Sequence, residues 1–117
     1  MVGENSLFGM HGTALALRSQ RLSMLASNIA NAATPGYKAR DIDFARALEQ
    51  AESGSRADEA IDGATAYRVP VTASIDGNTV ELATEQTAFA ENAVAYQTTL
   101  SFLNGRIGQI TRALKGE

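Results

Sequence analysis

Residues 84–114, TEQTAFAENAVAYQTTLSFLNGRIGQITRAL, hold the longest regular pattern in the sequence. Apolar side chains recur there at alternating intervals of four and three residues, the heptad spacing of a helix that packs against another helix. This heptad stripe consists of Phe89, Ala93, Tyr96, Leu100, Leu103, Ile107, Ile110 and Leu114. It predicts a C-terminal helix roughly 45 Å long. Its partner is either another helix of the same chain or a neighbouring subunit.

A second helix is predicted over residues 9–33, where apolar residues form two adjacent stripes at helical spacing. The first stripe consists of Leu15, Leu22, Leu25, Ile29 and Ala32, and the second of Met10, Leu17 and Met24. Together they make an apolar face that is too wide for contact with a single helix. The surplus predicts self-association or partner binding.

The N-terminal helix is expected to end at Thr34, Pro35 and Gly36. Proline disfavours helical backbone at the residue before it and cannot donate to the helix ladder. A Pro-Gly pair also suits the two central positions of a type II turn. These three residues therefore predict a helix-terminating turn that directs the chain away from the helix.

The region between the two helices is expected to be irregular. Residues 34–66 are predicted to be a turn followed by a flexible segment, because residues 41–62 hold seven acids and only two arginines. Residues 67–82 are predicted to form a small β-hairpin around the turn signal Asp76-Gly77, with Pro70 placing the first strand at an edge.

The predicted fold is thus mainly α, in a single unit spanning residues 1–117. Two long terminal helices pair as an antiparallel coiled-coil-like unit, with a small β-hairpin and a flexible acidic middle segment between them. Apolar residues make up 44% of the chain, but many are alanines, and there is no tryptophan. A monomer with so few large core residues is expected to be marginally stable.

Composition also restricts the function. The net charge is −3, which argues against nucleic acid as a main partner. No stretch approaches the roughly 18 apolar residues of a membrane span, so an integral membrane protein is not expected. The N-terminus shows no basic and apolar signal-peptide pattern.

No catalytic, metal or cofactor site is predicted. The chain has no cysteine and one histidine, His11, for which a surface or cap position is the favoured interpretation over a catalytic one. Asp41 and Asp43 fit a helix start, whereas Asp58 and Glu59 fit a solvated charge cluster. Neither pair has the spacing of an EF-hand loop, and we expect no enzyme activity.

Residues 26–38, ASNIANAATPGYK, resemble the N-terminal signature of flagellar basal-body rod and hook proteins, in which a helix ends in Ser-Asn-x-x-Asn before Thr-x-Gly-Tyr. The stretches KARDIDF at 38–44 and DGNTVEL at 76–82 are similar to the proximal rod subunits of that family, as are residues 91–105. The resemblance covers about two-thirds of the chain, although residues 45–66 match no known pattern.

This resemblance implies a structural subunit of the proximal rod, one of the axial proteins that form a helical tube transmitting torque. It implies export through the flagellar type III apparatus without a cleaved signal peptide, and assembly in the periplasm. The implied partners are further copies, other rod subunits, the basal-body adaptor protein and the membrane ring protein. Two alternatives remain: another rod or hook-type axial protein, and a cytoplasmic coiled-coil adaptor unrelated to flagella.

Assembly contacts are expected along both helices. The candidate residues are Leu22, Leu25, Asn28, Ile29 and Asn31 in the first helix and Phe89, Tyr96, Leu100, Leu103 and Ile107 in the last. Asn28 and Asn31 are open to two interpretations. They form either a polar rim before the turn or amide hydrogen bonds between subunits that fix register, as a buried asparagine does in coiled coils.

Overall fold

A computed structural model describes residues 4–68 and 74–116. The chain is mainly helical. In order, it forms α1 (Glu4–Ala30), β1 (Arg40–Ile42), α2 (Phe44–Glu52), α3 (Ala57–Ala64), β2 (Thr65–Tyr67) and α4 (Leu82–Lys115).

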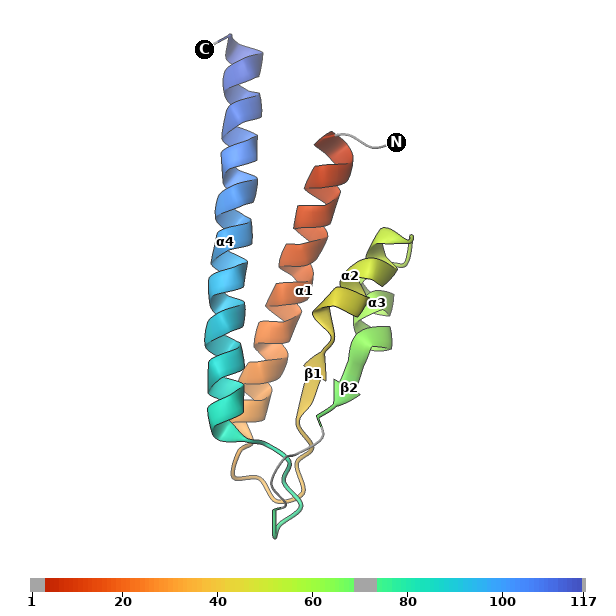
Figure 1. Cartoon of the computed structure of the whole chain (residues 1–117), viewed down its shortest axis with the longest axis vertical. Coiled ribbons are helices and arrows are strands. Elements are labelled where there is room, and N and C mark those ends of the chain that lie inside the picture. Colours follow the sequence, from red (N-terminus) through yellow and green to blue (C-terminus); the bar gives the residue numbers. More distant parts are fainter. Residues whose placement is uncertain (1–3, 69–73, 117) are drawn as a thin grey trace.

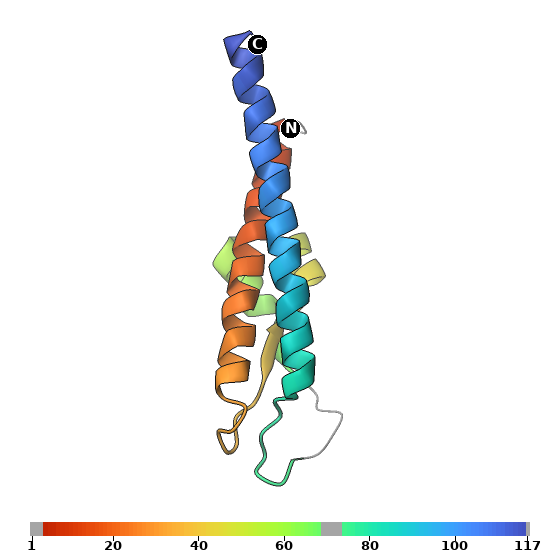
Figure 2. The same cartoon turned by 90° about the vertical axis from the view of Figure 1, so that its left-hand side faces the viewer.

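The two long helices lie side by side and run in opposite directions (Figures 1 and 2). This confirms the predicted antiparallel pair. With 34 residues against 27, α4 exceeds α1 by about 10 Å at 1.5 Å per residue. Figure 1 shows the excess at the C-terminal end of α4, which rises beyond the N-terminal end of α1.

α1 is the central element of the molecule. It has α4 on one side and the middle segment, residues 40–67, on the other (Figure 1). This arrangement explains why its apolar face is wider than one helix contact requires. The stripe containing Leu17 and Met24 packs against the middle segment, so part of the predicted surplus is covered within the chain itself.

The core between α1 and the middle segment is small and rich in alanine. Fully or nearly fully buried Leu17, Ile42, Ala47 and Ala64 form its centre. Met24, Phe44, Leu48 and Ile61 are partly buried around them. Alanines at the contact points let two short helices approach α1 closely, although each buries little apolar area.

The middle segment contains two short helices where a flexible segment was predicted within residues 34–66, and the first of them begins at the helix start expected at Asp43. Asp43 is the N-cap of α2, where its Oδ1 accepts a hydrogen bond from the Arg46 amide at 3.2 Å. Ala47 and Ala60 are fully buried, whereas Glu49, Asp58 and other acids of the segment point to solvent. The acidic composition correctly indicated a surface exposed to solvent. It gave no sign of the apolar residues, such as Ala47 and Ala60, that the two short helices bury.

The small antiparallel sheet is present, but not as the predicted hairpin over 67–82. Its strands are β1 and β2, paired with Arg40 opposite Tyr67 and Ile42 opposite Thr65. The amide of Arg68 donates to the Ala39 carbonyl at 2.8 Å and extends the pairing. Most of the predicted first hairpin strand lies outside the described residues. The predicted second strand instead leads into α4, which begins at Leu82.

The chain reverses after α1 through the Pro-Gly turn. The Tyr37 amide donates to the Thr34 carbonyl at 3.3 Å, and Gly36 has φ of 75°, as position i+2 of a type II turn requires. α1 itself ends at Ala30, three residues before the expected boundary. The carbonyls of Ser27, Asn28 and Ile29 at the end of the helix accept from the Asn31 and Ala32 amides. The side-chain amide of Asn78 donates to the carbonyls of Asn31, Ala32 and Thr34 and so holds the turn that follows α1.

Candidate assembly interface

α4 carries exposed apolar side chains along one flank. Phe89 and Ile107 both lie about 60° around the helix from Asn92, which is buried against α1. We call the residues Leu82, Phe89, Ile107 and Leu114 the α4 flank; they are 45%, 36%, 49% and 84% exposed, respectively. Four large apolar side chains aligned on one helix and open to solvent are typical of a surface that binds another protein.

The heptad stripe is therefore offset from the face that meets α1. Glu85 and Asn92 are the buried residues of α4. Tyr96, Leu100 and Leu103 are half-buried at the edge of the helix pair. One edge of the stripe is thus half-buried, whereas the other edge is exposed and available to a second partner.

Several candidate residues of α1 do not lie at the surface. Leu25 and Asn28 are fully buried, whereas Leu22, Ile29 and Asn31 are half-buried. A side chain with no exposed area cannot touch a neighbouring subunit in this conformation. In the single chain, Leu25 and Asn28 are therefore structural residues, and their assignment as assembly contacts stays a prediction.

Asn28 is fully bonded within the chain. Its Nδ2 donates to the Arg40 carbonyl at 2.7 Å and to Glu85 Oε2 at 3.0 Å. Its Oδ1 accepts from the Arg40 amide at 3.2 Å and from the Tyr37 hydroxyl at 3.4 Å. Two donors and two acceptor positions exhaust the hydrogen-bonding capacity of an asparagine side chain. No amide group remains for the predicted bond between subunits.

Asn31 acts locally. Its side-chain amide donates to the Ser27 carbonyl at 2.8 Å, and its Oδ1 accepts from the Thr34 hydroxyl at 3.0 Å. These bonds hold the last turn of α1 against the Pro-Gly turn. The polar-rim interpretation describes Asn31 better than the intersubunit one.

Charged residues distant in the sequence meet beside Asn28. We call Arg21, Asn28, Asp41, Arg68 and Glu85 the polar cluster. Arg21 Nε donates to Asp41 Oδ1 at 2.8 Å, and Arg68 Nη2 donates to Asp41 Oδ2 at 2.7 Å. Arg68 Nη1 also donates to Glu85 Oε1. The cluster ties α1, β1, the end of β2 and the start of α4 together.

The cluster shifts the acidity of its members. Burial by itself would raise the pKa of Asp41, but the Arg21 and Arg68 hydrogen bonds and the Ile42 amide outweigh it and lower that pKa below its ordinary value. The same contact with Asp41 raises the pKa of Arg21. Asp41 is therefore ionised and paired at neutral pH.

Sequence reasoning identified Asp41 only as part of a helix start and did not single out Arg68 or Glu85. Glu85 stands seven residues before Asn92, so both occupy the same heptad position. Two polar residues one heptad apart beside an apolar stripe could have indicated a buried polar position in the helix pair. No sequence pattern pointed to Arg68, because its partners Glu85 and Asp41 lie 17 and 27 residues away.

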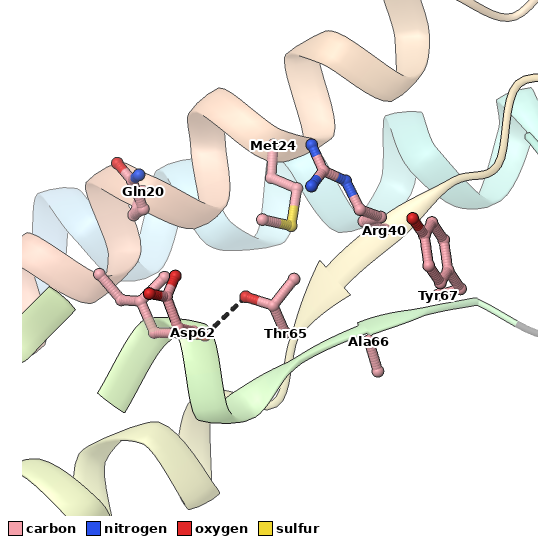
Figure 3. Close-up of a pocket in the computed structure, with 8 residues that line it drawn as sticks. Gln20, Met24, Arg40, Asp62, Thr65, Ala66 and Tyr67 are labelled. Carbon is pink, nitrogen blue, oxygen red and sulfur yellow. Dashed lines mark hydrogen bonds between the residues drawn. The ribbon is translucent and has the colours of Figure 1, made fainter. Parts of the chain in front are cut away.

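A pocket of about 400 Å³ lies where α1, β1, α3 and β2 meet (Figure 3). Met24 and Ile61 line it with apolar surface. Figure 3 shows Arg40 and Tyr67 at one end, with Gln20 and Asp62 at the other. Thr65 Oγ1 donates to the Ile61 carbonyl at 2.6 Å. Among the residues that line the pocket, no nucleophile is hydrogen-bonded to a base.

His11 contacts Phe102 across the helix pair, with ring centroids 4.6 Å apart. Among residues 4–68 and 74–116, no three His, Cys, Asp or Glu side chains are grouped to hold a metal ion. Within the same residues, no helix is long and apolar enough to cross a membrane. The described surface does include the exposed apolar α4 flank, and the polar cluster holds the start of α4 against α1.

Comparison with known proteins agrees with this geometry. Residues 9–38 match the family model described as "Flagella basal body rod protein". The chain is 50% identical to the flagellar basal body rod protein FlgB of Cereibacter sphaeroides strain ATCC 17023 over the full length of both. The chain belongs to the FlgB family.

Other FlgB proteins are also similar. The Aeromonas hydrophila FlgB is 45% identical, over 94% of this chain and 93% of that one. The Escherichia coli K12 FlgB is 42% identical, over 87% of this chain and 88% of that one. The FlgB family consists of structural rod proteins, and this chain is a structural subunit of the proximal rod in the flagellar basal body. The cytoplasmic adaptor and other axial-protein alternatives are not favoured.

Proposed function

We propose that this FlgB-family chain joins a helical, torque-transmitting tube by packing its α4 flank against neighbouring axial subunits, and that it catalyses no reaction. The exposure of the flank carries the proposal. The single chain leaves four large apolar side chains exposed to solvent on this flank: Leu82, Phe89, Ile107 and Leu114. A neighbouring helix would remove them from water at a gain of about 25 cal/mol per Å².

The shape of the molecule supports this proposal. The chain measures 64 × 27 × 17 Å and has a radius of gyration of 17.5 Å, compared with about 13 Å for a compact domain of this length. Its accessible surface of 7386 Å² exceeds the roughly 6,100 Å² of a typical monomer of 12.3 kDa. An elongated subunit with excess surface fits a protein that completes its burial in an assembly.

We extend the proposal to location and partners. The chain would pass unfolded through the type III apparatus without a cleaved signal peptide and assemble in the periplasm. Its neighbours there would be further copies, other rod subunits, the basal-body adaptor protein and the membrane ring protein. Its small, alanine-rich core and lack of cysteine support this route, since both make unfolding for export easy. The pocket in Figure 3 would receive a side chain from a neighbour.

The test compares two glutamate substitutions on the same helix. Ile107→Glu puts a charge on the α4 flank, whereas Gln109→Glu places the same charge at an exposed position on a different face. Each variant is expressed in a host that is non-motile because its own FlgB-family subunit is deleted, and in which the native chain restores swimming. We expect Ile107→Glu to abolish rod assembly and swimming while the purified chain keeps its helicity, and Gln109→Glu to support both. Normal swimming with Ile107→Glu would rule out the flank as an interface.

A further inference from the structure

Three contacts join α1 and α4 at different heights. Asn28 donates to Glu85 at 3.0 Å near the turn end, and Asn92 Nδ2 donates to the Arg18 carbonyl at 2.8 Å farther along. The His11 and Phe102 rings meet near the opposite end. Between the first contact and the last, each helix advances by the same 17 residues. The first and last contacts therefore share one antiparallel register. The middle contact lies within one helical turn of it, since Arg18 is 10 residues from Asn28 and Asn92 is 7 residues from Glu85.

Apolar packing alone does not specify that register. On α4, Phe89, Tyr96, Leu103 and Ile110 follow one another at intervals of seven. On α1, the same interval separates Leu15, Leu22 and Ile29. If α4 slid along α1 by seven residues, apolar side chains would again face apolar side chains. The hydrophobic contact would be nearly as favourable in the slipped pair.

The buried polar residues distinguish the two arrangements. A slip of seven residues that brings Asn92 opposite Asn28 would carry Glu85 beyond the end of α1, away from its bonds to Asn28 and Arg68. It would also put Thr99 in the place of Asn92, facing the Arg18 carbonyl. A slip in the other direction would place non-helical residues opposite Asn28, because α4 begins at Leu82.

Asn92 is a buried polar residue that favours one helix alignment at a cost in stability. It is 1% exposed, and its Oδ1 has no hydrogen-bond partner in the part of the chain that the structure describes. A leucine there would bury apolar area without leaving an acceptor unsatisfied. A buried polar residue that lowers stability is best known for fixing register in helix pairs.

We infer that Glu85 and Asn92 determine the register of the α1–α4 pair and thereby the length of α4 that projects beyond α1. The inference goes beyond the proposed function, because it concerns how the single chain selects one of two equally apolar alignments. Register also decides which part of the α4 flank is presented to a neighbour. Glu85 and Asn92 are positioning residues in this role and need not touch a partner.

The test replaces both residues with leucine in the full-length chain. In the Glu85→Leu/Asn92→Leu variant, Arg68 can still pair with Asp41, which lies 2.7 Å away. Arg21 also pairs with Asp41, so both arginines of the polar cluster keep a carboxylate partner. Because the chain has no cysteine, Ser19→Cys and Gln109→Cys provide two exposed attachment points for spin labels. Pulsed electron paramagnetic resonance then measures the distance between α1 and α4 labels.

We expect a single distance with the native residues and a second population displaced by about 10 Å in the leucine variant, since seven residues of helix span that length. Helicity should not fall. The matched control, Gln86→Leu/Gln97→Leu, adds the same apolar side chains at exposed positions of α4 and should keep the single distance. A loss of stability without a new distance would show a merely structural role.

A single native distance in a folded Glu85→Leu/Asn92→Leu chain would overturn the inference. The packing of the middle segment against α1 would then be what fixes the register. If that variant lost its helicity, the single Asn92→Leu change would decide. Its partner is a backbone carbonyl, so it leaves no charge unpaired. A second distance population in it would support the inference, and a single one would refute it. Neither measurement depends on rod assembly.

Discussion

At the scale of single residues, asparagines and charged side chains hold the segments of this chain together. Asn28 bonds to β1 and α4, and Asn78 bonds to the turn that follows α1. Asp41 receives two arginines from different elements. Because apolar residues are few and small, these polar contacts define which segments meet, and their loss should be visible in stability.

Asp41→Asn tests the ion pairs of the polar cluster. The pKa of Asp41 is lower in the folded chain than in the unfolded one. Its contribution is therefore fully present above about pH 4, the ordinary aspartate value, and is lost as the pH falls through the lower folded pKa. At pH 7 we expect urea unfolding of the variant to show a loss of about 1–3 kcal/mol, because Arg21 loses its carboxylate. The difference from the native chain should shrink in acid.

Asp58→Asn is the control for Asp41. Asp58 pairs with Arg56 at 3.5 Å, but both side chains are more than two-thirds exposed. Exposed pairs of this kind contribute little, so the change should stay within about 0.5 kcal/mol. Equal effects at the two positions would mean that the cluster contributes nothing special.

Asn78→Ala tests the turn that follows α1. One side-chain amide serves three carbonyls there, and the residue is only 6% exposed. Its removal leaves those acceptors without that donor, so we expect a loss of roughly 1–3 kcal/mol in chemical denaturation. Asn104→Ala, at an exposed position of α4, should be neutral or slightly stabilising because alanine favours helix. An unaffected Asn78→Ala chain would contradict the role of Asn78 in holding this turn.

At the scale of elements, helix periodicity and caps explain where each segment begins and ends. The heptad stripe locates α4 within two residues at its start and one at its end. Asp43 begins α2, and the Pro-Gly turn follows α1. The β1–β2 pairing was not predictable in the same way, since two three-residue strands far apart in sequence carry almost no periodic signal.

Gly105→Ala tests whether α4 needs its glycines. A Cβ at Gly105 would meet no atom within 4 Å, so within the single chain the glycine only weakens the helix. We expect the alanine variant to raise the free energy of unfolding by about 0.5–1 kcal/mol, as measured by urea denaturation. If the gain in stability comes with a failure to assemble, a neighbouring subunit approaches the helix at this point. A loss of stability would contradict the open surroundings of Gly105.

At the scale of the whole molecule, three layers share one central helix. α1 contacts α4 on one side and the middle segment on the other, so its two apolar stripes are both used. The core is small enough that a single large side chain affects both layers. The α4 flank remains exposed outside this arrangement, and it is the surface that we propose for assembly.

Leu17→Ala tests that shared core. Leu17 is fully buried against Ile42, Ala47 and Ala64, so the truncation should cost roughly 2–5 kcal/mol. Amide hydrogen exchange should accelerate in both α1 and the middle segment, because one core supports both. Leu114→Ala makes the same chemical change at an 84% exposed position and should leave exchange unaltered. Acceleration confined to α1 would mean that the middle segment is stabilised separately.

The sequence by itself determined the two long helices, the turn between α1 and β1, and the family signature, because periodicity, proline and local motifs act over a few residues. It also indicated more apolar helix surface than one pair of helices covers. Only the tertiary structure decided that the acidic middle segment folds onto α1, that Asn28 bonds inward, and that Arg68 and Glu85 meet. Those outcomes depend on contacts between residues far apart in the chain. Such contacts contribute free energy only once the segments are packed together, so no local pattern in the sequence reports them.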